Sequence, residues 1–196
     1  GKSAREDTEE AVRSVSLLYL DELAGRREQV VAENLQDRIR DMQSALELMT
    51  EEDLQDEAHR QAYQKKMKAL FVIEKFAFVD TDGLIYTSLG VQDNIDEYSF
   101  DHAGISEAGI SVKNLSNEDK KVIIATPVDL MSEGHHMVVC FMEIDMEQMK
   151  ADIAARDKAD SEREISPLVQ AEDATLLDTT GLSIDEVVDR ILAMCQ

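Results

Sequence analysis

The feature that most constrains the fold is a switch in hydrophobic period near residue 71. Before it, apolar residues recur every three or four positions, as on one face of an α-helix. The clearest stripe consists of Val31, Leu35, Ile39, Met42, Leu46 and Met49. After the switch, short apolar runs alternate with turn residues, a pattern typical of β-strands. The sequence therefore predicts an α+β fold in which a long N-terminal helix packs on an antiparallel sheet.

The helical pattern is expected to form a stalk over residues 1–70. Further apolar residues continue the stripe upstream at Val12, Val15, Tyr19 and Leu23. Gly25 is expected to weaken the long helix, and a second helix is predicted at 55–70. The stripe fits either packing against the chain's own sheet or a homodimer contact, and a homodimer through this helix is expected. A module that works only by dimerisation is a further alternative.

Residues 71–148 are predicted to form a sheet of five antiparallel strands. The first two form a hairpin around Asp80-Thr81-Asp82-Gly83, where Gly83 stands at a position that favours positive φ. The polar stretch from residue 90 to 109 is expected to cross over as a helix. The remaining strands are expected near 110–112, 122–128 and 136–141.

The charge balance excludes a broad class of functions. With 42 acidic and 20 basic residues, the chain has a formal net charge of −22. This charge opposes nucleic-acid backbones, so no nucleic-acid partner is expected. No stretch approaches the roughly 20 apolar residues of a membrane-spanning helix. Because the chain begins at Gly1 rather than Met, we expect an excised part of a larger protein, with membrane contact only through segments outside this sequence.

Residues 10–148 contain no pattern typical of a catalytic or metal site. His135 and His136 are adjacent, and neighbours in a strand face opposite sides, so they are not expected to share a metal ion. Cys140 and Cys195 have no metal-ligand spacing. We therefore predict no catalytic residue, no metal and no cofactor.

Three features of this region together carry a family resemblance. They are the long helix, the strand pair around the Asp-Gly turn, and a strand-turn-strand run in which Pro127-Val128 ends one strand and Gly134 makes the turn. This combination resembles the PAS-like Cache sensor domains of bacterial transmembrane receptors. The resemblance implies an extracytoplasmic ligand-sensing domain that binds a small molecule. Its long helix would transmit to a diguanylate cyclase or histidine kinase.

The same resemblance implies a ligand site at Tyr86, Thr126 and Glu143. Glu143 stands where amino-acid-binding members place an acidic partner for the ligand amine. The aromatic and Arg pattern of those members is not present in the expected segments. The alternative interpretations are core packing for Tyr86, a strand hydroxyl for Thr126 and a solvated strand end for Glu143.

Residues 149–196 have a different character and are predicted to form a helix-strand-helix tail. The region contains RDKADSEREISP from Arg156, then AEDATLLDTTGLSIDEVV up to residue 188. From about residue 150 to 194 it is similar to the C-terminal segment of bacterial cytidylate kinases. The resemblance implies nucleotide binding by Arg156, Asp160 and Arg163, because guanidinium groups suit phosphate oxygens. Their spacing of i, i+4 and i+7 equally allows an ion-pair ladder on one helix face.

A complete nucleotide kinase of this type needs a phosphate-binding loop of the form G-x-x-x-x-G-K-[ST]. Gly1-Lys2-Ser3 matches only its last three residues. The chain as given is therefore predicted not to be an enzyme but a sensor domain joined to a kinase C-terminus. The sequence does not distinguish a natural fusion from an engineered chimera. The alternative function is a cytidylate-kinase-derived nucleotide-binding protein, or a fusion of the two.

Overall fold

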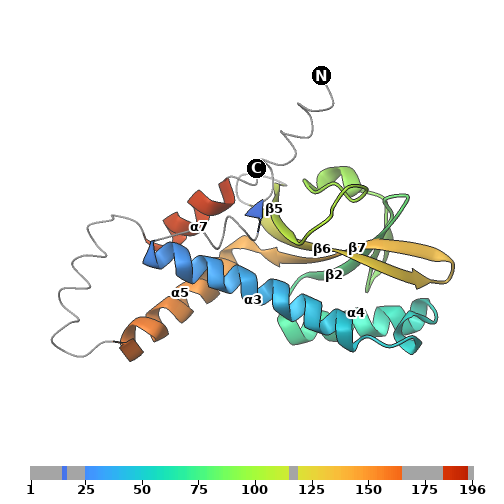
Figure 1. Ribbon diagram of the computed structural model, residues 1–196, viewed down its shortest axis with the longest axis horizontal. Coiled ribbons are helices and arrows are strands. Elements are labelled where there is room, and N and C mark those ends of the chain that lie inside the picture. The colour runs from blue at the N-terminus through green and yellow to red at the C-terminus, as the bar shows by residue number, and fades with distance from the viewer. Residues whose placement is uncertain (1–14, 17–24, 115–118, 165–182, 194–196) are drawn as a thin grey trace, which may run out of the picture.

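The computed structural model describes residues 15–16, 25–114, 119–164 and 183–193. Within these ranges one antiparallel sheet packs with four α-helices (Figure 1). The helices are α3 (Arg26–Leu48), α4 (Glu57–Phe71), α5 (Met146–Glu164) and α7 (Ile184–Ala193), with 3-10 turns η1 (Glu52–Leu54) and η2 (Ile95–Glu97). The strands are β1 (Val15–Ser16), β2 (Lys75–Asp80), β3 (Ile85–Thr87), β4 (Gly90–Gln92), β5 (Gly109–Asn114), β6 (Lys120–Ser132) and β7 (His135–Asp145). The predicted α+β class is confirmed.

The sheet has the order β1-β5-β6-β7-β2-β3-β4, so β7, the last strand among the described residues, lies beside the β2–β3 hairpin. The prediction of five strands is wrong, because β1 and β4 bring the number within the described residues to seven. Val15, which we assigned to the helical stripe, pairs instead with Ile110 of β5. The two missed strands are two and three residues long, too short to show an alternating pattern.

The predicted stripe of α3 packs against the chain's own sheet. Val31, Leu35, Ile39 and Met42 are all at most 1% exposed. They share a core with apolar side chains of β2, β5, β6 and β7. Figure 1 shows α3 and α4 running along one face of the sheet. A homodimer through α3 would therefore need another part of the helix surface, and that dimer stays a prediction.

Helix α4 begins at a cap that also binds a histidine. The Asp56 carboxylate accepts a hydrogen bond from the backbone N–H of His59 at 2.8 Å and lies 2.7 Å from its ring Nδ1. These contacts lower the pKa of Asp56 and raise the pKa of His59. Their stabilisation is lost as the pH falls through the lowered pKa of Asp56, and again as it rises through the raised pKa of His59.

A single irregular segment, residues 93–108, covers the opposite face of the sheet. The predicted helical crossover is only the one turn η2 within this segment. Tyr98 and Phe100 pack on Phe141 of β7, with ring centroids 4.9 and 5.5 Å apart. Gly83, at φ +83°, lies against His102, so the β2–β3 turn contacts the segment at its edge. The second face thus holds a smaller apolar core of its own.

The C-terminal helices belong to the larger core. Helix α5 follows β7 directly, and α7 packs against both α3 and α5. Five apolar side chains of α7 are buried with those of the sheet and of α3: Ile184, Val187, Val188, Ile191 and Leu192. Lys150 of α5 forms an ion pair of 2.6 Å with Asp189 of α7. The expected division into residues 1–70, 71–148 and 149–196 stays a prediction, and side chains from all three ranges share one core.

Candidate functional site

Charged side chains gather on the sheet face beneath the 93–108 segment. Glu143 of β7 is only 3% exposed, and three groups lie around its carboxylate. The Tyr98 hydroxyl donates to Oε1 at 2.8 Å, Lys113 Nζ of β5 lies 3.7 Å from Oε1, and Lys75 Nζ of β2 lies 3.5 Å from Oε2. Glu97 joins the group through Lys113, at 3.4 Å. We call these five residues the buried charge cluster.

The cluster holds two carboxylates and two ammonium groups, so its formal charges balance. Lys113 also lies over the ring of Tyr98, 4.5 Å from its centroid. Burial and the nearby Glu143 carboxylate raise the pKa of Tyr98, so its hydroxyl stays protonated as a donor. The Asn94 amide and Lys113 lower the pKa of Glu97. Such a cluster can bind a ligand that carries both charges, because each charge finds an opposite partner.

A buried hydroxyl lies in the same part of the sheet. Strand register pairs Ser111 with Ile123, and Ile123 with Glu143, so the three residues share one face. Ser111 is 2% exposed, and its Oγ makes no hydrogen bond within the described part of the chain. Native proteins satisfy most buried hydroxyls, so this unpartnered one is a candidate contact for a polar ligand.

A small cavity lies in the covering segment next to the cluster. Its volume is about 210 Å³. It is lined by Ile95, Asp96, Tyr98, Ser99, Phe100, Asp101 and His102. Tyr98 belongs to both the cavity wall and the cluster, so its ring connects the space to the charges.

The structure does not bring the three predicted ligand residues together. Tyr86 and Thr126 are buried on the helix-covered face, whereas Glu143 lies on the other face. The Tyr86 hydroxyl donates to Asp80 at 2.7 Å, and the Arg60 guanidinium lies 5.0 Å from the centre of its ring. The structure places Glu143 in a buried cluster, rather than at a solvated strand end.

Sequence reasoning missed Tyr98, Lys113 and Ser111. A signal for two of them was present, because Ser111 and Lys113 alternate with Ile110 and Val112 in β5. That alternation separates a polar face from an apolar one. It could not show that the polar face is also covered, since the cover comes from the irregular segment before the strand.

The second predicted set lies on α5. Arg156 forms an ion pair of 2.5 Å with Asp37 of α3 and contacts Asn34 at 3.5 Å. The side chains of Asp160 and Arg163 fall outside the described residues. Arg156 is therefore a half-exposed group at the contact between α5 and α3, and whether it binds nucleotide stays a prediction.

The described ranges contain neither a metal-ligand cluster nor a membrane-spanning helix. No group of three or more His, Cys, Asp or Glu side chains there could hold a metal ion. His136 contacts Asp129 at 2.6 Å. Among the described helices, none is long and apolar enough to cross a membrane.

Comparison with protein families gives a match in the C-terminal part of the chain. A family model described as cytidylate kinase matches residues 137–196. The cytidylate kinase of Anoxybacillus flavithermus is 41% identical over 99 residues, which cover 48% of this chain and 44% of the relative. The cytidylate kinase of Streptococcus pneumoniae (strain Hungary19A-6) is 47% identical over 81 residues, which cover 40% of this chain and 36% of the relative. The C-terminal part of this chain is similar to cytidylate kinases.

These matches overturn one expectation. The prediction that the chain is not an enzyme is contradicted, because the matching family and both relatives are kinases. The matched region begins at residue 137, inside β7, and thus earlier than the boundary we placed at 149. The chain spans less than half the length of the curated relatives it matches.

Two solved structures are also similar to the chain, at 10% sequence identity. One is the ligand-binding domain of the Campylobacter jejuni chemoreceptor Tlp3 in complex with L-norvaline, with a TM-score of 0.46 over 78% of this chain and 62% of that one. The other is the sensory domain of the same receptor with isoleucine bound, with a TM-score of 0.39 over 65% of this chain and 66% of that one.

Proposed function

We propose that the sheet and the 93–108 segment form a sensory unit that binds a small zwitterionic molecule at the buried charge cluster. The observation that carries this proposal is the pairing of Glu143 with Lys113 beneath a covering segment, beside a buried hydroxyl that has no partner among the described residues. A ligand ammonium would take the place of Lys113 at Glu143, and a ligand carboxylate would take the place of Glu143 at Lys113. Exchanging one ion pair for two leaves no charge uncompensated.

The receptor context belongs to the same proposal. The unit would lie on the extracytoplasmic side of a bacterial membrane, within a larger signalling protein. Glu143 is three residues before the start of α5, so a shift of β7 on binding would move that helix directly. Because α5 contacts α3, the signal would pass from β7 through α5 to α3.

Calorimetric titration of the whole chain with leucine, isoamylamine and isocaproate tests the ligand class. The three probes share the same branched apolar side chain. Leucine carries both an ammonium and a carboxylate, isoamylamine only the ammonium, and isocaproate only the carboxylate. We expect leucine to bind more tightly than either single-charge probe. Tyr98→Phe should weaken leucine binding about ten-fold, because a hydrogen bond near a charged group is lost.

Tyr86→Phe is the matched control for this titration. It also removes a buried hydroxyl bonded to a carboxylate, but on the opposite face of the sheet. Its affinity for leucine should equal that of the unaltered chain. Equal weakening by the two substitutions, or equal binding of all three probes, would count against the proposed site.

The family match supports a second candidate function. We propose that residues 137–196 contribute to binding cytidylate, the substrate that the name of the family gives, and that Arg156 contacts its phosphate. The carrying observation is the 41–47% identity to cytidylate kinases, together with a half-exposed guanidinium in the matched region. Transfer of the terminal phosphoryl group of ATP to cytidylate is the reaction that this candidate implies.

Cytidylate titration followed by NMR tests the second candidate, with CDP formation from ATP measured in parallel. We expect Arg156→Ala to abolish the chemical-shift changes that cytidylate causes. Arg40→Ala is the matched control, since Arg40 also pairs with Asp37, at 2.7 Å, but lies outside the matched region. Shift changes that survive in Arg156→Ala would place any nucleotide site elsewhere.

A further inference from the structure

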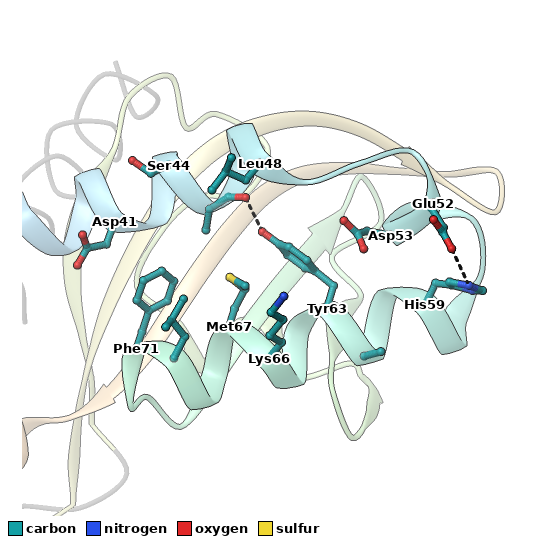
Figure 2. Close-up of a pocket in the computed structure, with 13 residues that line it drawn as sticks. Asp41, Ser44, Leu48, Glu52, Asp53, His59, Tyr63, Lys66, Met67 and Phe71 are labelled. Atoms are coloured by element: carbon teal, nitrogen blue, oxygen red, sulfur yellow. Dashed lines mark hydrogen bonds and ion pairs between the residues drawn. The ribbon is translucent and has the colours of Figure 1, made fainter.

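A groove runs between α3 and α4 on the outer side of the helix layer. Its volume is about 670 Å³, within the size range of small-molecule sites. Figure 2 shows side chains of both helices facing this space, Leu48 from α3 and Met67 and Phe71 from α4. The Tyr63 hydroxyl donates to the Ala45 carbonyl at 2.6 Å and joins the two helices. The groove is independent of the buried charge cluster, which lies on the other face of the sheet.

The walls of the groove expose large apolar side chains. Leu48 is 80% exposed and Leu70 is 65% exposed, although both lie on helices whose other faces are buried. Covering such side chains is favourable by about 25 cal/mol for each Å² of apolar surface removed from water. The groove therefore suits an occupant with an apolar middle.

The two ends of the groove are acidic. Asp41 lies at one end, and Glu52 and Asp53 lie at the other, with the apolar walls between them (Figure 2). Lys66 projects between these ends, and His59 lies beside Glu52 with a ring nitrogen 3.8 Å from its carboxylate. Carboxylates outnumber the ammonium group, and the whole chain carries −22. The electrostatic potential of the groove thus favours a cation.

We infer that the α3–α4 groove binds an elongated organic dication, an alkane diamine whose ammonium groups meet the acidic ends and whose chain covers the apolar walls. The acidic ends of the groove favour this occupant over others that an apolar groove could bind. A fatty acid would bring its carboxylate to carboxylates. A second copy of this chain would bring its own acidic groove against this one, at a cost in repulsion.

Octamethylenediamine, octylamine and suberate are the probes that test this inference, by calorimetry with the whole chain at low salt. The three probes share an eight-carbon skeleton. Octamethylenediamine carries two positive charges, octylamine one positive charge, and suberate two negative charges. We expect the diamine to bind about three-fold more tightly than octylamine, because its second ammonium group adds one exposed ion pair. Suberate should not bind. Equal binding of the diamine and suberate would overturn the inference.

Variants at exposed positions locate the site without disturbing the core. Leu48→Arg should abolish diamine binding by filling the groove with a positive side chain. Leu89→Arg is the matched control, since Leu89 is 87% exposed and lies outside the groove. Asp41→Asn should weaken diamine binding about three-fold through loss of one exposed ion pair, and Lys66→Met should strengthen it by removing a like charge.

Two further results would overturn the inference. Binding of a basic amphipathic peptide without binding of the diamine would assign the groove to a protein partner. Self-association of the unaltered chain that Leu48→Arg abolishes and Leu89→Arg preserves would assign it to a second copy. Sedimentation velocity at the concentrations of the titration measures the second result.

Discussion

A Val188→Asp substitution is expected to destabilise the sheet together with α7. Val188 is 0% exposed and belongs to the core that contains α3 and the helix-covered face of the sheet. A carboxylate there would be buried among apolar side chains, at a cost we expect to exceed about 4 kcal/mol. A domain of this size is stable by about 5–15 kcal/mol, so a large part of its stability would be lost. Urea unfolding followed by circular dichroism measures the change.

The same measurement shows whether the C-terminal region folds together with the sheet. If residues 149–196 formed a separate unit, Val188→Asp would melt α7 and leave the main unfolding transition in place. We expect instead one transition at lower urea concentration, seen equally by circular dichroism and by tyrosine fluorescence. Ala193→Asp adds the same charge at an exposed position of α7 and should leave the midpoint nearly unchanged. A midpoint for Val188→Asp equal to that of the control would refute the shared core.

Local patterns in the sequence predicted the elements whose burial depends on one regular face. The stripe from Val31 to Met42 defined α3, and the second helix predicted at 55–70 corresponds to α4. The Asp80–Gly83 turn located the β2–β3 hairpin. Each of these signals acts within a few residues of the chain, so no knowledge of the tertiary fold was needed.

The candidate site was predictable only in part, because it depends on strand register. Glu143 was singled out as a ligand residue, a role that stays a prediction, and the structure gives it buried partners. Thr126 does not lie on the same face as Glu143, because its partner in β7 is Cys140, whereas Glu143 pairs with Ile123. Residues 123 and 126 are an odd number of positions apart and face opposite sides of the sheet. A single sequence does not fix this register.

The partners of α7 were likewise beyond local pattern. The capping residues Ser183 and Glu186 mark the start of the helix, and the Glu186 backbone N–H donates to the Ser183 hydroxyl at 3.3 Å. Its apolar stripe shows that one face is buried, but not against which surface. The pattern also resembles cytidylate kinases, yet its burial against α3 involves a segment far away in the chain.

The second large effect is expected at the buried charge cluster. Glu143→Leu should destabilise the fold by about 3–5 kcal/mol, because removing one member of a buried ion pair leaves the other without compensation. Lys113 is 4% exposed and would keep only the half-exposed Glu97 as a charged partner. Tyr98 would lose the acceptor of its hydroxyl. Urea unfolding gives the loss, and Glu97→Gln, which removes the exposed partner of Lys113, should have a much smaller effect.

Combining Glu143→Leu with Lys113→Met separates the structural role of the cluster from its proposed role in binding. The double variant replaces both buried charges by apolar side chains, so most of the stability lost in Glu143→Leu should return. Lys75 would remain, and because it is only partly buried its ammonium can reach water. Leucine binding should stay absent, since neither ligand charge would then find its partner. A double variant that is stable and still binds leucine would show that the cluster is a structural ion pair and that the ligand lies elsewhere. A double variant as unstable as Glu143→Leu would show that the stability lost in Glu143→Leu does not come from the uncompensated Lys113.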